Sequence, residues 1–170
     1  MQVQIQLLTS AHDRTNFTCG EAELEKWFKT QASQQQGKNT SRTFVIVDET
    51  APAVVLGFYA LTVSEVDGSL LPLRKLPEKV PVIRLARLAV RDDLQRTVHR
   101  LGETLLLNAV ERAVEISSSG AGVAIAVDAK HDKAASFYMK YGFQRSPDNP
   151  LMLFLPMSAC RQHVMAGWQS

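Results

Sequence analysis

The residues best placed to do chemistry lie between an apolar strand and a long helix. Val82–Val90 is an apolar run, Arg91–Arg100 is a charged segment without glycine or proline, and Leu101–Ile116 consists of good helix formers. A strand, a loop and a helix in this order direct unpaired backbone N–H groups and a helix dipole at an anion. The order predicts a phosphorylated ligand, but buried strands precede helices in every α/β protein. The pattern alone therefore does not identify a site.

A second candidate is Tyr138, which belongs to a short amphipathic helix. The apolar positions of this helix follow the helical period: Ala134, Phe137, Tyr138 and Tyr141. Gly142 follows and is typical of a helix end. The pattern alone favours a core tyrosine whose hydroxyl is hydrogen-bonded. A phenol is protonated at neutral pH, since its ordinary pKa is about 10.

The remaining reactive side chains do not form a metal site. The two cysteines, Cys19 and Cys160, lie far apart and lack metal-ligand spacing, which favours reduced thiols. His131 follows Asp128 at the end of a predicted strand, and a lone histidine there is more often a loop residue than a base. We expect no metal cofactor.

Length and composition indicate one globular domain. The chain has 170 residues, enough to bury a real core, so we expect a single domain over residues 1–170. The net charge of +2 is too small to indicate nucleic-acid binding by itself, although a local basic patch is compatible with it. No apolar run has the length of a membrane span, and the first residues do not resemble a secretory signal. These features predict a cytoplasmic protein without a membrane partner.

Periodicity predicts the elements that must position these residues. Strands are expected over residues 3–7, 42–48, 54–63, 82–90, 123–129 and 151–155. Helices are expected over residues 21–29, 101–116 and 134–141, and a further partial helix from Pro156 to Trp168. Residues 34–41 are expected to form a polar, mobile loop and residues 71–81 a proline-rich connector. The order predicts an α/β (α+β) fold with a mixed, mostly antiparallel sheet of six to seven strands and helices on both faces.

Three segments form a recognisable combination: Phe17-Thr18-Cys19-Gly20 before a helix with Leu24 and Trp27, Ser41–Val45 with Val80–Val90, and Ala135–Phe143 with Pro150–Met157. Together they resemble the GNAT-fold acetyltransferase toxins of bacterial type II toxin–antitoxin systems. The resemblance covers nearly the whole chain. It implies transfer of acetyl from acetyl-coenzyme A to the α-amino group of aminoacyl-tRNA, which stops translation. It also implies a ribbon-helix-helix antitoxin as partner and a homodimer.

The resemblance also implies roles for particular residues. Leu88, Ala89 and Val90 match the splayed strand that holds the pantetheine and faces the thioester, and Tyr138 matches the proton donor to the coenzyme A sulfur. The pyrophosphate would be bound by residues at the start of the long helix: Arg96, Arg100, Leu101, Gly102 and Glu103. An α-amine titrates near pH ~7.7–8.0, and an adjacent ester lowers this, so the acceptor needs little base assistance. Positioning, oxyanion stabilisation and protonation of the thiolate are the harder tasks.

The predicted phosphate loop departs from the family pattern, which is Arg/Gln-x-x-Gly-x-Gly/Ala. In one alignment Thr97 takes the leading position and Arg100 the first glycine, so that only Gly102 survives. A shifted alignment puts Gln95 or Arg96 first but loses both glycines. The segment is also about two residues longer than the usual one. A branched Val98 and a bulky Arg100 are expected to disfavour the tight loop conformation.

Three interpretations of this departure stay open. Arg96, His99 and Arg100 could supply side-chain charge in place of backbone donors. The helix could begin earlier and occlude the loop, so that coenzyme A binds weakly. The chain could also be a catalytically impaired GNAT module that acts by binding an antitoxin or nucleic acid.

The sequence also leaves the acceptor of the acetyl group undecided. A protein amino terminus or a small amine is the alternative to aminoacyl-tRNA. Basic residues could contact tRNA phosphates, although scattered cations usually form a solvated surface. They are Lys26, Lys29, Lys38, Arg42, Arg74, Lys75 and Lys79. The sequence does not identify the tRNA or the antitoxin.

Overall fold

The computed structural model describes residues 1–167 as seven strands and five α-helices with two short 3-10 turns. The strands are β1 (Val3–Leu7), β2 (Arg42–Asp48), β3 (Gly57–Asp67), β4 (Lys79–Val90), β5 (Ala124–Asp128), β6 (Gln144–Arg145) and β7 (Met152–Pro156). The helices are α1 (Ala22–Thr30), α2 (Ala32–Gly37), α3 (Leu101–Ser119), α4 (Asp132–Met139) and α5 (Met157–Ala166). The 3-10 turns are Gly68–Leu70 and Asp92–Leu94.

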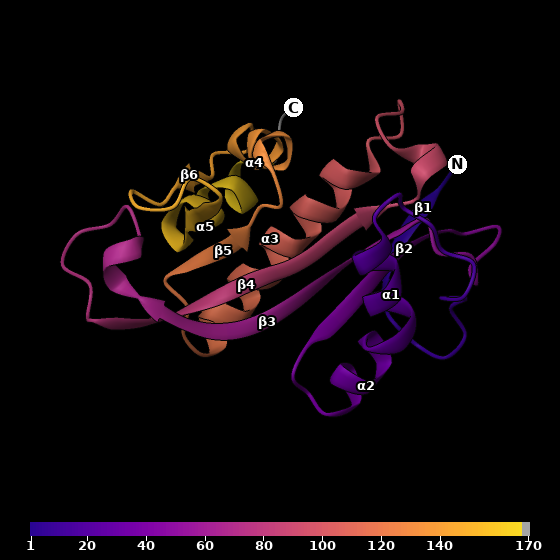
Figure 1. Ribbon diagram of the computed structural model, residues 1–170, viewed down its shortest axis with the longest axis horizontal. Helices are drawn as coiled ribbons and strands as arrows, with labels where there is room; N and C mark the ends of the chain where they lie inside the picture. The colour runs from indigo at the N-terminus through magenta and orange to yellow at the C-terminus, as the bar shows by residue number, and fades with distance from the viewer. Residues whose placement is uncertain (168–170) are drawn as a thin grey trace. The chain divides into compact units, whose positions relative to one another are not determined.

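All seven strands belong to one sheet in the order β1-β2-β3-β4-β5-β7-β6, and Figure 1 labels each of them except β7. The pairs β1–β2, β2–β3, β5–β7 and β6–β7 are antiparallel. The pair β4–β5 is parallel and aligns Ile83 with Ile125. The predicted mixed, mostly antiparallel sheet is therefore confirmed.

The chain forms two compact units. The first comprises Met1–Thr62 and Ala86–Ala109, and the second comprises Val63–Leu85 and the chain from Val110 onward. The strands β3 and β4 and the helix α3 each begin in one unit and end in the other. The single domain expected from the sequence stays a prediction.

Within the first unit, one face of β2 and β3 packs against α1. Val45 and Val47 of β2 share a buried cluster with Trp27 and Phe28 of α1 and with Phe58 of β3. The Phe28 and Phe58 rings stack with centroids 4.2 Å apart. Figure 1 shows α1 and α2 on the same side of β2. The amphipathic stripe predicted for α1 is thus the face that covers the sheet.

The opposite face of these strands packs against the first half of α3. The Tyr59 hydroxyl donates a hydrogen bond of 2.5 Å to Asn108 Oδ1 on α3. A Cβ atom at Gly57 would lie 2.8 Å from the Ala89 carbonyl oxygen and 3.0 Å from Leu105 Cδ1. Because no side chain fits there, glycine allows β3, β4 and α3 to approach closely. Helices therefore cover both faces of the sheet in this unit, as predicted.

The second unit is built around β5, whose apolar residues are buried from Ala124 to Val127. This continuous apolar run is typical of a central strand covered on both faces. The antiparallel β7 pairs with it along its whole length, Ala124 to Pro156 and Asp128 to Met152. Cys160 of α5 is buried in this unit, and burial raises the pKa of its thiol to about 12.

The prediction of a polar loop over Gln34–Ser41 is wrong for the first part of that segment. A short helix, α2, runs from Ala32 to Gly37. Ala32 is fully buried, and the Gln36 side chain donates to the Leu8 carbonyl (2.7 Å) and accepts from the Thr43 amide (2.9 Å). These tertiary contacts stabilise a helix that the polar sequence does not favour by itself.

Other boundaries differ by a few residues. The strand predicted from Val54 begins at Gly57, the strand predicted from Val82 begins at Lys79, and α3 continues to Ser119. The tail helix after Pro156 is confirmed as far as Ala166. Its predicted end at Trp168 lies outside the described residues.

Candidate active site

The end of β4 is fixed by backbone hydrogen bonds within the first unit. The Arg91 amide donates to the Leu56 carbonyl (2.9 Å), and the Asp92 amide donates to the Thr18 carbonyl (3.0 Å). Ala89 and Val90 are buried, whereas Leu88 is half-buried. The segment predicted to hold pantetheine is therefore a rigid strand end rather than a flexible loop.

The turn that follows β4 contains an ion pair. The Arg91 guanidinium donates to both carboxylate oxygens of Asp93, at 2.6 and 3.0 Å. These bonds lower the pKa of the Asp93 carboxyl and raise the pKa of Arg91. Pairing with Arg91 thus compensates the negative charge of the Asp93 carboxylate.

Two arginines of the predicted phosphate loop adopt left-handed backbone conformations. Arg96 has φ 57° and Arg100 has φ 50°. Arg100 occupies the position aligned with the first motif glycine, so the loop keeps a glycine-like conformation without the glycine. We expected Arg100 to disfavour this conformation, and in the structure the conformation forms nevertheless. Its cost is about 1–2 kcal/mol per residue for a non-glycine side chain.

The helix α3 begins at Leu101, as the sequence predicts. The interpretation in which an earlier helix start occludes the loop is therefore wrong. The first intrahelical bond joins the Thr104 amide to the Arg100 carbonyl (3.1 Å). The amides of Leu101, Gly102 and Glu103 precede this bond, so they are the donors that the helix geometry leaves available to an anion.

The Arg100 side chain is paired with Glu103, another predicted binding residue. Arg100 Nη2 lies 2.5 Å from Glu103 Oε2, and the Glu103 side chain is only 13% exposed. The pair places the positive charge of Arg100 beside the Glu103 carboxylate. Arg96 and His99 are exposed, as is Arg100.

A residue that the sequence analysis did not select holds this loop. Gln95 Nε2 donates to the carbonyl oxygens of Cys19 and Val90, each at 2.8 Å. The shifted motif alignment, which put Gln95 in the leading position, was the only sequence feature that pointed to it.

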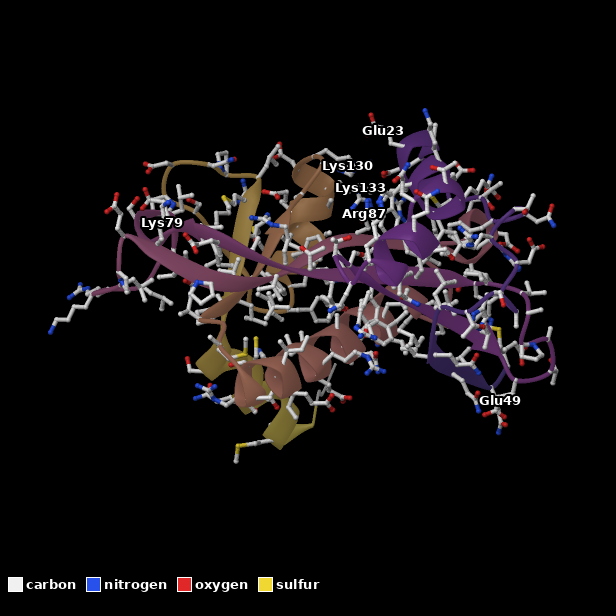
Figure 2. The ribbon with its side chains drawn as sticks, turned by 90° about the horizontal axis from the view of Figure 1, so that it is seen from below. Glu23, Glu49, Lys79, Arg87, Lys130 and Lys133 are labelled. Atoms are coloured by element: carbon white, nitrogen blue, oxygen red, sulfur yellow. The ribbon has the colours of Figure 1, made fainter. Side chains whose placement is uncertain are left out.

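Arg87 precedes the predicted pantetheine segment and packs on α1. Its guanidinium carbon lies 4.1 Å from the centroid of the Trp27 ring, a cation–π geometry. Figure 2 shows Arg87 on the side of the sheet that carries α1. Burial lowers the pKa of this arginine.

Tyr138 belongs to the second unit, where it is half-buried in an aromatic cluster on α4. Its ring centroid lies 5.2 Å from that of Phe137 and 5.5 Å from that of Phe143, both in edge-to-face geometry. The Phe143 and Tyr141 amides donate to backbone carbonyls of α4, and Gly142 turns the chain with φ 93°. The predicted helix stop at Gly142 is confirmed.

His131 is the N-cap of α4. Its Nδ1 accepts a hydrogen bond of 3.1 Å from the Ala134 amide. This structural role fits the loop interpretation better than that of a base. Among residues 1–167, no three His, Cys, Asp or Glu side chains gather in a way that could hold a metal ion. Within the same residues, no helix is long and apolar enough to cross a membrane.

A polar hollow of about 400 Å³ lies apart from the predicted site residues, lined by residues 10–15 and Lys29. His12 is 7% exposed there, accepts from the Thr9 amide at Nδ1 (3.0 Å) and lies 3.0 Å from Gln6 Oε1 at Nε2. Since Nδ1 accepts, Nε2 carries the proton. Burial lowers the pKa of this neutral histidine.

Eight of the nine predicted site residues fall in the first unit, on β4, the loop and the start of α3: Leu88, Ala89, Val90, Arg96, Arg100, Leu101, Gly102 and Glu103. Tyr138 falls in the second unit. The first unit thus contains the predicted cofactor segment, and the second contains the predicted proton donor.

Comparison with known proteins decides the family. The chain is 37% identical over 157 residues to the tRNA-acetylating toxin of Mycobacterium tuberculosis, and the match covers 91% of this chain and 92% of that toxin. The chain belongs to this family of tRNA-acetylating toxins. The GNAT toxin family predicted from the sequence is therefore confirmed, although no family model matches the chain.

Solved structures of toxins agree with this assignment. A tyrosine-to-phenylalanine mutant of KacT matches with a TM-score of 0.88 at 25% identity, covering 95% of this chain and 99% of KacT. AtaT complexed with acetyl-methionyl-tRNAfMet matches with a TM-score of 0.86 at 26% identity, covering 96% and 99% of the two chains. AtaTR bound with acetyl-coenzyme A matches with a TM-score of 0.81 at 27% identity, covering 95% and 98%. The predicted fold is confirmed.

Proposed function

We propose that this chain is a toxin that transfers acetyl from acetyl-coenzyme A to the α-amino group of aminoacyl-tRNA. The observation that carries the proposal is the 37% identity to a tRNA-acetylating toxin over nearly the whole of both chains. AtaT, similar in fold over 96% of this chain, was solved with an acetylated aminoacyl-tRNA. An acetylated α-amine can no longer attack a peptidyl ester, so translation stops.

The first unit supplies a binding site suited to a pyrophosphate. The amides of Leu101, Gly102 and Glu103 lie at the positive end of a 19-residue helix. Arg96 adds an exposed guanidinium, while Arg100 neutralises Glu103. Acetyl-coenzyme A would supply the acyl group as an activated thioester. The chain holds it by these donors and by the strand end at Leu88–Val90.

Tyr138 is the proton donor in this proposal. The acceptor amine attacks the thioester carbonyl as a free base, the C–S bond breaks, and the phenol protonates the departing thiolate. KacT was solved as a tyrosine-to-phenylalanine mutant, and so was AtaT, which supports a functional tyrosine in these toxins. The acceptor amine loses its proton to solvent.

The same relatives support a proposal for the partners of this chain. AtaT was solved bound to the C-terminus of the antitoxin AtaR. We infer that this chain is blocked by an antitoxin of the ribbon-helix-helix type, forms a homodimer, and acts in the cytoplasm, where its tRNA substrate is. We also infer that residues 1–170 function as one GNAT domain, because β3, β4 and α3 each run through both compact units.

The test combines binding and transfer. Calorimetric titration with acetyl-coenzyme A should give saturable micromolar binding, equivalent to about −8 kcal/mol. Radiolabelled acetyl should then pass to charged tRNA and not to deacylated tRNA. If acetyl-coenzyme A binds but acetyl passes only to a protein amino terminus or a small amine, that amine replaces aminoacyl-tRNA as the proposed acceptor. If no binding occurs at millimolar acetyl-coenzyme A, the chain is a binding module rather than an enzyme.

A further inference from the structure

Arg87 is a partly buried cation of the first unit. Its guanidinium carbon lies 4.1 Å from the centroid of the Trp27 ring. Within residues 1–167, no carboxylate forms an ion pair with Arg87, and no oxygen accepts a hydrogen bond from it. A guanidinium has five N–H donors. Burial therefore removes part of the water from these donors without supplying an acceptor, and it lowers the pKa of Arg87.

Trp27 contributes a second donor that is not satisfied. The side chain is 7% exposed, and its Nε1 is buried with no hydrogen-bond partner among the described residues. The indole is held in place by Phe58, whose ring stacks with it at a centroid distance of 6.1 Å. Arg87 and Trp27 thus bring together a positive charge and donors for which the described part of the chain supplies no acceptor. Such a combination is suited to an anionic ligand.

Arg87 also lies beside the strand end that is proposed to hold the thioester. Ala89, two residues further along β4, belongs to the same buried cluster as Trp27. Figure 2 shows Arg87 on the side of the sheet that carries α1. The first half of α3, whose N-terminal amides are proposed to bind the pyrophosphate, packs against the opposite face of β2 and β3. The position of Arg87 therefore suits the second substrate rather than the phosphates of the cofactor.

We propose that Arg87 binds the phosphodiester of the acceptor RNA that is nearest to the aminoacyl ester, an inference that rests on the proposed function. The acceptor amine has to reach the thioester at the end of β4. The ester linkage bears no negative charge, so this phosphodiester is the backbone anion closest to the reacting atoms. The planar guanidinium can bind a phosphate through two parallel N–H bonds, and stacking on Trp27 fixes its plane. Arg87 thus positions the acceptor, and its loss costs affinity for aminoacyl-tRNA rather than for acetyl-coenzyme A.

Substitution of Arg87 by methionine and by lysine tests this role. Methionine keeps an unbranched side chain over Trp27 but removes the charge, whereas lysine keeps the charge and loses the planar pair of donors. We expect the KM for aminoacyl-tRNA to rise about tenfold in Arg87→Met and less in Arg87→Lys. The kcat at saturating aminoacyl-tRNA and the Kd for acetyl-coenzyme A should stay near wild type. A raised Kd for acetyl-coenzyme A would overturn the proposal, because Arg87 would then serve the cofactor.

The salt dependence of the reaction measures the same contact in another way. One phosphate contact to single-stranded RNA contributes about 0.7 to the slope of log affinity against log salt concentration. The slope of log kcat/KM for aminoacyl-tRNA should therefore be shallower by about 0.7 in Arg87→Met and unchanged in Arg87→Lys. A slope that is unchanged in Arg87→Met would contradict a contact with phosphate.

Two small acceptors locate the contact and separate this inference from the proposed function. The aminoacyl ester of the dinucleotide CpA contains one phosphodiester, and the aminoacyl ester of adenosine contains none. The wild type should use the first with a kcat/KM about tenfold higher, and Arg87→Met should use the two almost equally. A wild type without this preference, or a variant that keeps it, would overturn this inference alone. Failure of the wild type to acetylate any aminoacyl ester would overturn the proposed function and this role together.

Arg14 offers a matched control in the same unit. Its guanidinium is also partly buried, but it donates to the Phe28 and Lys29 carbonyls at 3.1 and 3.0 Å. We expect Arg14→Met to lower Tm without changing the KM for aminoacyl-tRNA or its salt dependence. An equal rise in KM in both methionine variants would count against the proposal, because it would then reflect a general loss of stability.

Discussion

The two motifs that resemble the toxin family make their turns by different means. At the end of α4 the turn uses Gly142, with φ 93°, a conformation that glycine adopts without steric cost. At the start of α3 the chain reaches left-handed conformations at Arg96 and Arg100. Both turns thus contain left-handed residues, but only one of them uses glycine.

The difference shows how a left-handed conformation can form without glycine. The strained loop is surrounded by compensating contacts: the two hydrogen bonds of Gln95, the Arg91–Asp93 pair and the Arg100–Glu103 pair. These contacts oppose the strain of about 1–2 kcal/mol that each left-handed arginine carries. The α4 turn needs no such support.

The largest effect is expected in the motif that keeps its glycine. Tyr138→Phe removes the proposed proton donor but leaves the ring packed against Phe137 and Phe143. We expect kcat to fall by about 10²–10⁴ with little change in the Kd for acetyl-coenzyme A. Steady-state transfer assays and calorimetry measure the two quantities. A kcat near wild type would show that the half-buried tyrosine is only a packing residue.

Gly142→Ala tests the turn itself. A Cβ atom at Gly142 would have room, with its nearest neighbours 3.5 and 3.6 Å away, so the cost comes from φ alone. We expect a loss of about 1–2 kcal/mol in the free energy of unfolding, measured with urea. Gly120→Ala is the control, because Gly120 has no positive φ and also has room. Equal effects in the two variants would contradict the conformational explanation.

A pair of substitutions at Arg100 tests the left-handed conformation in the loop before α3. Both Arg100→Gly and Arg100→Ala lose the contact with Glu103, but only glycine relieves the positive φ. The glycine variant should therefore be more stable than the alanine variant by about 1 kcal/mol. Thermal and urea unfolding of the two proteins test this. An alanine variant as stable as the glycine variant would mean that the loop does not hold φ 50° in solution.

The smallest effect is expected from pH and concerns only the first unit. Burial lowers the pKa of His12 below its ordinary value of 6.5, so the unfolded chain binds this proton more readily than the folded chain. The contribution of neutral His12 to the free energy of unfolding is therefore complete above pH 6.5 and is lost as the pH falls below it. Urea unfolding at several pH values should show a loss in wild type that His12→Gln lacks. Parallel curves for the two proteins would contradict this role.

Much of the fold was predictable because its strands and main helices have clear periods. The helix α2 was not, since its residues are polar and its stability depends on Ala32 and Gln36 contacting other elements. The strand β4 was predicted too short because Pro81 signals a break. In the structure, however, the carbonyl of Pro81 accepts from the Val123 amide. Both errors come from contacts between distant residues.

For the site, sequence placed the loop and the start of α3 correctly but misjudged the loop conformation. Arginine rarely adopts a positive φ, and this local preference was the only guide that the sequence offered at Arg100. Gln95 was missed because its partner Cys19 lies far away in the chain. The role of Tyr138 depends on the family, and stays a prediction for this chain.

The division of the chain also has a consequence for its synthesis. The first unit needs Ala86–Ala109, but the ribosome delivers Val63–Leu85, which belongs to the second unit, before that segment. Neither unit can therefore finish folding while the chain is half made. A nascent chain released before residue 109 would lack part of α3, and with it part of the first unit. The first unit can therefore complete its fold only after Ala109, and the second only after the segment from Val110 onward has been synthesised.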